Sequence, residues 1–348
     1  RYRREYPTLA VPSHICLPRA DHRTPFLPDT IPPPLEGCYH RGMTSVLVVQ
    51  YSQTGQLTDV TRRIVEPLLE SPDIRVTIET LRPVTPFPFP WPFLKFFDTF
   101  PETVYLDAPP LEPLTVDPST RFDLIILAYQ VWFLSPSLPV TAFLKSPAGA
   151  SLLRDTPVVT VIACRDMWLM AQEQVKTLLS DAGARLVGNV VLVDEAGTAG
   201  SFLATPVWMM TGKRGPHLFG LIPRAGVKPE QITAARRFGE RIRDRLRAGG
   251  PLDAQLLSHL GAVRVNEKLI ASERTARRSF QIWGGLLRKM GPHGAAARKP
   301  VLIVYIVFLV TLIVTFIPVS MLLKALLAPL LRSRVAAQKA YFAQPSGE

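Results

Sequence analysis

The chain has 348 residues, of which 47% are hydrophobic and 20% are charged, so it can bury one sizeable core and still leave long segments outside it. Its formal net charge of +12 does not indicate a nucleic-acid partner, because nine basic residues against two acidic ones lie between Arg264 and Lys299, directly before a long apolar segment. Charge gathered at that place favours a membrane surface. The three cysteines are too few and too scattered for a disulfide framework or a zinc site, and we expect no metal site.

Residues 1–42 are rich in proline and show no sustained helical or strand periodicity. Such a stretch buries too little apolar surface to offset the entropy lost on ordering it, and it lacks the apolar core of a secretory signal. We expect residues 1–42 to be disordered or a spurious N-terminal extension, and the folded protein to begin at Met43.

Five short apolar runs alternate with helical patterns over residues 43–250. The runs are Ser45 to Tyr51, Ile74 to Leu81, Asp123 to Tyr129, Pro157 to Cys164 and Leu186 to Val193. A helix is expected at Gln56 to Glu70, directly after the first run, where apolar residues recur at helical spacing. Near-continuous apolar strands separated by helices are typical of a parallel sheet covered on both faces. We therefore predict an α/β domain with a doubly wound, five-stranded parallel sheet.

Residues 83–121 interrupt this pattern with ten prolines and eight aromatic residues. A loop of this length inside a compact domain is usually functional or disordered, and the aromatic content argues against disorder. Two interpretations stay open. The segment is either a cap packed over the edge of the sheet or a lid over a cofactor or an apolar substrate.

A basic helical pattern from about Pro229 to Ala248 follows the last strand. Its apolar positions recur at helical spacing, at Ile232, Ala235, Phe238 and Ile242. We expect this helix to form the last layer of the α/β domain, with these side chains facing the sheet.

The basic region 251–299 contains a second helical pattern, from Arg274 to Met290. Apolar residues fill one face of this helix and arginines and lysines fill the opposite face, which is typical of an amphipathic helix lying in a membrane interface. The alternative is a soluble helix packed on the domain. Nearness to the apolar segment that follows favours the membrane.

Residues 301–323 contain no charged side chain. As a helix this run would be about 34 Å long, which suffices to cross a bilayer core of about 30 Å. The alternative, a buried core helix, is disfavoured by the basic residues at both ends. We predict a transmembrane or membrane-anchoring helix within residues 300–331 and a basic tail over residues 332–348.

A candidate anion site lies between the first strand and the first helix, at Ser52, Gln53, Thr54, Gly55 and Gln56. Free backbone N–H groups and the positive end of the helix dipole meet there, the hydroxyl groups add hydrogen bonds, and the glycine lets the backbone approach closely. The loop has no lysine and matches neither the Walker motif nor G-x-G-x-x-G. It therefore favours a phosphate monoester over a nucleoside triphosphate or a dinucleotide.

The stretch Tyr51 to Gln56 resembles the first loop of the flavodoxin family, S/T-x-T-G-x-T, which binds the phosphate of FMN. It departs from that motif at Leu57, where flavodoxins usually carry threonine. The resemblance covers roughly Thr44 to Val193 and implies a flavodoxin-like fold with FMN as cofactor. It also implies two further flavin loops, which contain Tyr129, Gln130, Trp132 and Phe133 after the third strand, and Cys164, Arg165 and Trp168 after the fourth.

The resemblance gives these residues expected roles. Trp132 or Phe133 would stack on the isoalloxazine ring, and Arg165 would meet a flavin carbonyl or a second anionic ligand such as NAD(P)H, the expected reductant. The alternatives are core packing for the aromatic residues, Trp168 included, and an ion pair with Asp166 for Arg165.

A closer resemblance links the chain to bacterial flavodoxin-like proteins labelled dialkylresorcinol condensing enzymes. It is carried by Y-S-Q-T-G-Q-L-T, Y-Q-V-W-F-L-S-P-S, V-I-A-C-R-D-M-W-L-M-A-Q-E and the terminal membrane segment. Condensation of the ketoacyl-synthase type needs a nucleophilic cysteine with two histidine partners. After Met43 the sequence offers only Cys164 and three scattered histidines, so we do not expect that chemistry.

Two functions are compatible with these patterns. One is a membrane-tethered FMN protein that transfers electrons or hydride to a lipophilic acceptor, either a quinone or an aryl-lipid biosynthetic intermediate. The other is a flavin-free accessory or scaffold protein of a dialkylresorcinol or aryl-lipid pathway. We expect the bacterial inner membrane as location, with a single-pass C-terminal anchor, the main domain in the cytoplasm, membrane lipids as partners and no nucleic acid.

Overall fold

The computed structural model describes residues 43–194, 196–316 and 332–348. The expected N-terminal extension, residues 1–42, lies outside the described residues, as do residues 317–323 of the expected span. All described residues belong to one compact unit that begins at Gly42.

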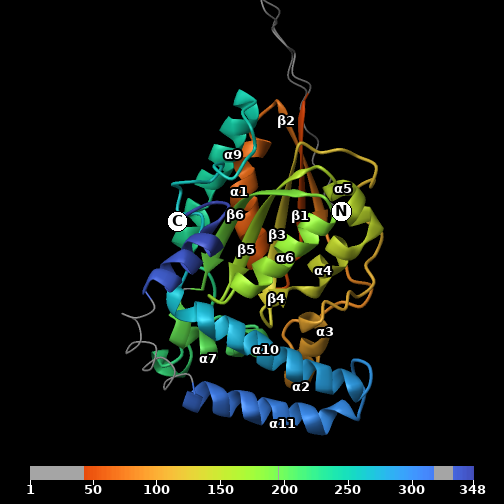
Figure 1. The fold of residues 1–348 in the computed structure, drawn as a ribbon, viewed down its shortest axis with the longest axis vertical. Coiled ribbons are helices and arrows are strands. Elements are labelled where there is room, and N and C mark those ends of the chain that lie inside the picture. The colour runs from red at the N-terminus through yellow and green to blue at the C-terminus, as the bar shows by residue number, and fades with distance from the viewer. Residues whose placement is uncertain (1–42, 195, 317–331) are drawn as a thin grey trace, which may run out of the picture. The chain divides into compact units, whose positions relative to one another are not determined.

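A parallel sheet forms the centre of this unit (Figure 1). Its strands are β1 (Thr44–Gln50), β2 (Ile74–Thr80), β3 (Leu124–Trp132), β5 (Pro157–Cys164) and β6 (Arg185–Val193). Their order is β2-β1-β3-β5-β6, and every neighbouring pair is parallel. This is the doubly wound order of flavodoxin-like folds, so the α/β class and the five expected strands are confirmed.

The structure corrects the expected number of strands from five to six. The additional strand, β4 (Ser135–Pro136), runs antiparallel to the end of β3 and pairs Ser135 with Trp132. Phe133 and Leu134 connect the two strands with positive φ angles of 46° and 60°. A two-residue turn with both φ angles positive usually carries glycine or asparagine, so the sequence contained no signal for it.

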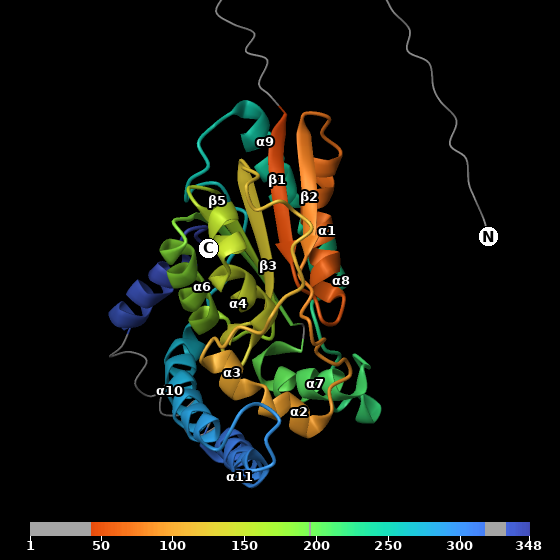
Figure 2. The same ribbon diagram turned by 90° about the vertical axis from the view of Figure 1, so that its right-hand side faces the viewer.

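Helices cover both faces of the sheet (Figure 2). On one face lie α4 (Leu138–Lys145), α5 (Pro147–Leu153) and α6 (Leu169–Asp181), and on the other lie α1 (Gln56–Leu69), α8 (Pro229–Ala234) and α9 (Arg236–Ala248). Alternate residues of β1 point to the two cores, Leu47 to the first and Val48 to the second. The helix expected after the last strand is confirmed as α8 and α9, since Phe238 and Ile242 are fully buried.

The proline-rich segment between β2 and β3 contains two short helices, α2 (Phe93–Asp98) and α3 (Phe100–Val104). Its returning part is tied to the edge strand β2, because the Glu79 carboxylate accepts hydrogen bonds from the backbone N–H groups of Thr115 at 2.8 Å and Val116 at 3.0 Å. This part agrees with the cap interpretation. The outgoing part, residues 83–91, leads over the carboxyl ends of the strands.

The C-terminal helices gather beyond the carboxyl ends of the strands, at the lower end of the ribbon in Figures 1 and 2. They are α7 (Gly197–Thr211), the short η1 (Leu218–Gly220), α10 (Glu267–Lys289) and α11 (Arg298–Thr311), which continues as η2 (Leu312–Phe316). Among the described residues, one helix, Arg298–Thr315, is long and apolar enough to cross a membrane.

The expected amphipathic helix forms as α10, but its apolar residues divide between two environments. Phe280 packs on Phe100 of α3 and Trp283 packs on Tyr305 of α11, whereas Ile282 remains exposed. The packing of Phe280 and Trp283 agrees with a helix packed on the domain, and the membrane interface stays a prediction for the exposed residues.

Residues 332–343 form a further helix, after which the last residues lie against the sheet. Phe342 is buried in the core on the α6 side, and Ser346 Oγ accepts a hydrogen bond from Asn189 N of β6 at 2.6 Å. The expected basic tail is therefore part of the folded unit.

The close crossing of α1 and α9 leads to a test of the fold. A Cβ atom at Gly239 would overlap the carbonyl oxygen of Ile64. Although alanine is intrinsically favoured over glycine in a helix by about 1 kcal/mol, we expect Gly239→Ala to lower the free energy of unfolding by about 1–3 kcal/mol through this overlap. Urea unfolding of the detergent-purified protein measures the change. Thr233→Ala, at an exposed position of α8, is the control, and equal stability of the two variants would contradict the close crossing.

Candidate functional site

The reversal of strand order places a candidate site at the carboxyl ends of β1 and β3. Strand β2 lies on one side of β1, and β3, β5 and β6 lie on the other. Loops that leave neighbouring strands in opposite directions open a crevice, and ligands of doubly wound folds bind there.

The loop after β1 forms an open cradle at the start of α1. Gly55 precedes the helix with a φ of 83°, and a Cβ atom placed on it would meet nothing within 4 Å. The positive φ explains the need for glycine, since other residues are strained there. The first N–H groups of α1 have no partner within the helix and carry its positive partial charge, so the open space in front of them suits an anion.

Buried polar atoms without a hydrogen-bond partner among the described residues gather at the same place. They are Gln50 Oε1, Ser52 Oγ, Gln53 Oε1 and Trp91 Nε1. Buried polar atoms are nearly always paired in folded proteins, because an unpaired one loses its hydration without compensation. Four such atoms at one end of β1 leave both donors and acceptors that a polar ligand would satisfy.

Gln53 joins three segments of the chain at this site. Its backbone N–H lies 3.4 Å from Gln130 Oε1 in the β3 loop, and its Nε2 donates to Pro88 O in the proline-rich segment at 2.8 Å. The first and second expected loops therefore meet, and residues 83–91 lie over them. The position of residues 83–91 thus agrees with the interpretation of this segment as a lid.

An aromatic cluster surrounds Trp132 next to this junction. The ring centroids of Phe87, Trp91 and Tyr51 lie 5.0, 5.8 and 6.1 Å from that of Trp132, all with edge-to-face geometry. Burial raises the pKa of the Tyr51 phenol to about 12, which keeps it neutral. Backbone contacts hold the cluster in place, since Trp91 N donates to Met209 O of α7 at 2.8 Å.

Two residues expected in the second flavin loop, Phe133 and Tyr129, do not lie at the junction with the first loop. Phe133 turns away at the β3–β4 connection and packs on Phe96 and Phe100. Tyr129 is fully buried, and its hydroxyl donates to Gln172 Oε1 of α6 at 2.6 Å. Of the residues expected in this loop, the structure brings Gln130 and Trp132 to the junction.

The third loop, after β5, is packed into the protein. Trp168 is buried in the core, and the Arg165 guanidinium lies 4.0 Å from the centre of the Phe202 ring and donates to Met167 Sδ. Burial lowers the pKa of Arg165 to about 10. Burial, followed by the charge of Asp166, raises the pKa of the Cys164 thiol well above its ordinary value, so a thiolate is disfavoured there.

A segment that sequence reasoning did not assign to the site closes it from another side. Gln56 Nε2 and Arg214 Nη2 both donate to Val227 O, at 3.3 and 3.1 Å. Asp194, at the end of β6, accepts from Gly226 N at 2.8 Å. These bonds bring the Arg214 guanidinium beside the start of α1. The only sequence signal was the basic, glycine-flanked run that contains Arg214.

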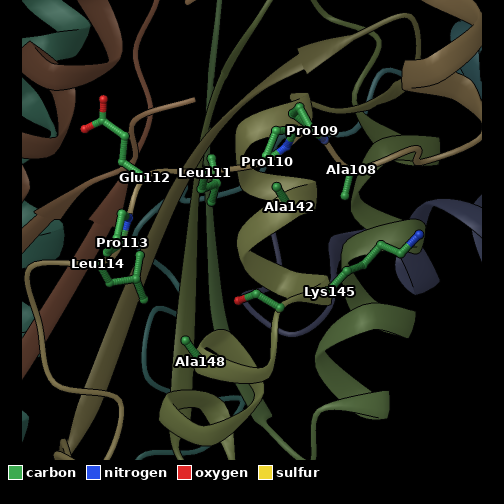
Figure 3. Close-up of a pocket in the computed structure, with 11 residues that line it drawn as sticks. Ala108, Pro109, Pro110, Leu111, Glu112, Pro113, Leu114, Ala142, Lys145 and Ala148 are labelled. Carbon is green, nitrogen blue, oxygen red and sulfur yellow. The ribbon is translucent and has the colours of Figure 1, made fainter. Parts of the chain in front are cut away.

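A pocket of about 340 Å³ lies elsewhere, between residues 108–114 and α4 (Figure 3). Leu111 and Ala142 are part of its lining, and Lys145 at the C-terminal end of α4 lines it too. No candidate residue from the sequence contributes to it. Over residues 43–194, 196–316 and 332–348, no group of three side chains has the composition of a metal site.

Glu273 connects α10 to the third loop. This carboxylate is fully buried, and its Oε2 accepts from Met170 N at the start of α6 at 3.0 Å, two residues after Trp168. Burial raises its pKa to about 8, and this effect exceeds the opposing one of the backbone hydrogen bonds.

A comparison with protein-family models finds no match, and neither does a comparison with curated proteins. Among solved structures, the chain is similar to a flavoprotein in complex with FMN from Lactobacillus acidophilus NCFM, with 17% identity over 43% of this chain and 93% of that one and a TM-score of 0.33. It is also similar to a flavodoxin from the domain Archaea, at 11% identity, 59% and 99% coverage and a TM-score of 0.33. A third is oxidised flavodoxin 1 from Bacillus cereus, at 12% identity, 57% and 95% coverage and a TM-score of 0.31. TM-scores this low do not establish a shared ligand, and the fold assignment rests on the strand order.

The raised pKa of Glu273 predicts how stability depends on pH. Below about pH 4.3, the ordinary pKa of glutamate, the carboxyl is neutral in the folded and the unfolded chain, and its full contribution to the free energy of unfolding is present. As the pH rises, the unfolded chain ionises first, so stability falls until the pH passes the folded-state pKa of about 8. We expect Glu273→Gln, which keeps an acceptor for Met170 N, to remove this part of the decline. Thermal unfolding between pH 5 and pH 9 measures it, and parallel profiles of the two proteins would contradict the prediction.

Proposed function

We propose that this chain is an FMN-binding electron-transfer protein that acts at a membrane on a lipophilic acceptor. The observation that carries the proposal is the group of buried, unpartnered polar atoms at the end of β1, in front of the positive end of α1. In a ligand that ends in a phosphate and continues as a polar chain, the phosphate would bind at the positive end of α1. The polar chain would form hydrogen bonds with the unpartnered atoms.

The phosphate end of FMN fits the cradle. Gly55 leaves open space, Ser52 Oγ can donate a hydrogen bond, and the N–H groups of α1 face a group with a charge of about −2. Arg214 adds a positive charge that the sequence motif lacks, which offsets the loss of the usual threonine at Leu57.

The flavin ring fits beside Trp132. This side chain is partly exposed, and the lid residues Phe87 and Trp91 extend its apolar surroundings. Bound FMN supplies one- and two-electron transfer, while the protein binds it, excludes water and tunes its potential. Trp91 Nε1 and Gln53 Oε1 are the groups of this chain that would orient the polar parts of the ligand.

A lipophilic acceptor is supported by the surface next to the lid. Phe93 and Leu94 of α2 follow the lid directly and are exposed, and Leu203 of α7 is exposed at the same end of the strands. Apolar side chains around a redox site favour an acceptor that arrives from the lipid phase, such as a quinone or an aryl-lipid intermediate.

Condensation chemistry finds no support at Cys164. Its thiol pKa is raised, the His217 ring bonds to Lys213 O, and the His293 ring lies 3.8 Å from Asp98. We therefore expect Cys164→Ala to retain the flavin content and biosynthetic contribution of the unmodified protein. Complete loss of that contribution in a normally folded variant would show that the thiol takes part in chemistry.

The flavin proposal predicts that detergent-purified protein is yellow and releases FMN, not FAD, on denaturation. Gly55→Ala places a Cβ in the cradle, and we expect it to weaken FMN binding by about tenfold or more, equivalent to about 1.4 kcal/mol. Gly261→Ala is a matched control, because Gly261 also has a positive φ and open space around its Cβ position but lies outside the loop. Fluorescence titration with FMN measures both affinities.

Equal loss of affinity in the two glycine variants would assign the effect to general backbone strain and count against the cradle. Colourless protein that takes up no added FMN would contradict the flavin proposal. That result would favour the flavin-free accessory role in an aryl-lipid pathway.

A further inference from the structure

Helix α11 exposes an uncharged apolar face. Ile303, Val304, Val307 and Val310, continued by Val314 of η2, lie within about a third of the helix circumference, and Val304 and Val307 are 58% and 61% exposed. The opposite side, with Leu302 and Tyr305, is buried against the protein. Water is a poor environment for so many adjacent β-branched side chains, so this apolar face is suited to a partner that removes it from water.

Basic side chains at the start of this helix identify the chemistry of the partner. Lys299 is the second residue of α11, Lys289 ends α10 and Lys95 lies on α2; all three are exposed, and none forms an ion pair within the part of the chain that the structure describes. An apolar surface with lysines at its border matches a bilayer that contains anionic lipids, whose headgroups lie above an apolar interior.

The chain before the apolar face is fixed to the flavodoxin-like domain. Arg298 is buried and its Nη2 lies 2.6 Å from Glu102 Oε1 of α3. Seven residues later, Tyr305 stacks on Phe100 with ring centroids 4.4 Å apart. A buried arginine that lost this carboxylate would leave an uncompensated charge, so the start of α11 cannot leave the domain at low cost.

The chain after the apolar segment is fixed to the same domain. The Tyr341 hydroxyl donates to Glu173 Oε2 of α6 at 2.7 Å, Phe342 is buried in the main core, and Ser346 bonds to Asn189 of β6. A helix that crossed the bilayer once would place residues 332–348 on the side opposite to β6 and α6. These contacts and a single crossing exclude each other.

We infer that this chain is a monotopic membrane protein. The apolar face of α11 lies in one leaflet of a bilayer with anionic lipids, and residues 332–348 lie on the same side of that bilayer as β6 and α6. This inference rests on the membrane association of the proposed function, and it replaces the single-pass anchor with a different topology. It also directs α2, which contacts α11 and directly follows the lid, towards the lipid, so that an acceptor reaches the flavin end from the bilayer.

The topology is tested by labelling single cysteines in sealed membrane vesicles of both orientations. The full chain with Cys16→Ser and Cys38→Ser receives either Arg62→Cys, on the exposed side of α1, or Ser333→Cys, just after the apolar segment. The same chain without an added cysteine gives the background from Cys164. We expect a membrane-impermeant maleimide to label both positions when the domain faces outward and neither when it faces inward.

Labelling of Arg62→Cys and Ser333→Cys from opposite sides would overturn the inference and establish a crossing. Recovery of the protein in the soluble fraction without detergent would overturn the inference together with the membrane part of the proposed function. Neither result changes the flavin content of the protein. The flavin absorbance of the purified protein therefore reports on the flavin site independently of the topology.

The docking face is tested by flotation with phosphatidylcholine vesicles that either contain or lack phosphatidylglycerol. We expect Val307→Asp to abolish binding to both, whereas Thr233→Asp on α8 leaves binding unchanged. Lys299→Gln should weaken binding about fivefold, the equivalent of about 1 kcal/mol per basic residue, on phosphatidylglycerol vesicles alone. Unchanged binding of Val307→Asp would overturn the assignment of the face. An equal effect of Lys299→Gln on both vesicles would overturn the role of anionic lipid.

Discussion

All five long strands run in the same direction, and this constraint determines where everything else lies. Parallel neighbours deliver each strand-to-helix loop to one edge of the sheet, and the change of order beside β1 opens that edge. The β1 loop with Gly55, the Trp132 cluster and the segment around Arg214 therefore converge from distant parts of the sequence. The long connection from β2 to β3 must pass this edge, which places the aromatic lid over it.

The sequence predicted what depends on local pattern. Strands buried on both faces are near-continuous apolar runs, so β3 and β5 were recognisable, and the S-x-T-G loop located the cradle. It did not predict what depends on distant partners. The Tyr129 hydroxyl is held in the core by a hydrogen bond to Gln172 of the later helix α6. The C-terminal tail is held against the sheet by a hydrogen bond between Ser346 and Asn189 of β6. The sequence did not predict β4, because the turn before it has Phe133 and Leu134 where glycine is usual.

Glu273 shows how the C-terminal helix α10 is joined to the helices that cover the sheet. A carboxyl group that accepts from Met170 N caps α6 at the point where the third loop ends. Because α10 carries this group and also packs on α3 through Phe280, it contacts both the proline-rich segment and the residues that follow the third loop. Helix α10 thus connects two parts of the chain that lie at the carboxyl ends of the strands.

The position of Ser346 has a consequence for the order of folding. Strand β6 is an edge of the sheet, and its outer N–H groups are satisfied by distant residues, Val191 N by Ala262 O and Asn189 N by Ser346 Oγ, which is 157 residues away along the chain. Closing a loop of that length costs more entropy than forming a local turn, so this part of the edge is covered late in folding. A partly folded chain therefore presents an unpaired edge strand together with an exposed apolar helix, and both favour association with other chains.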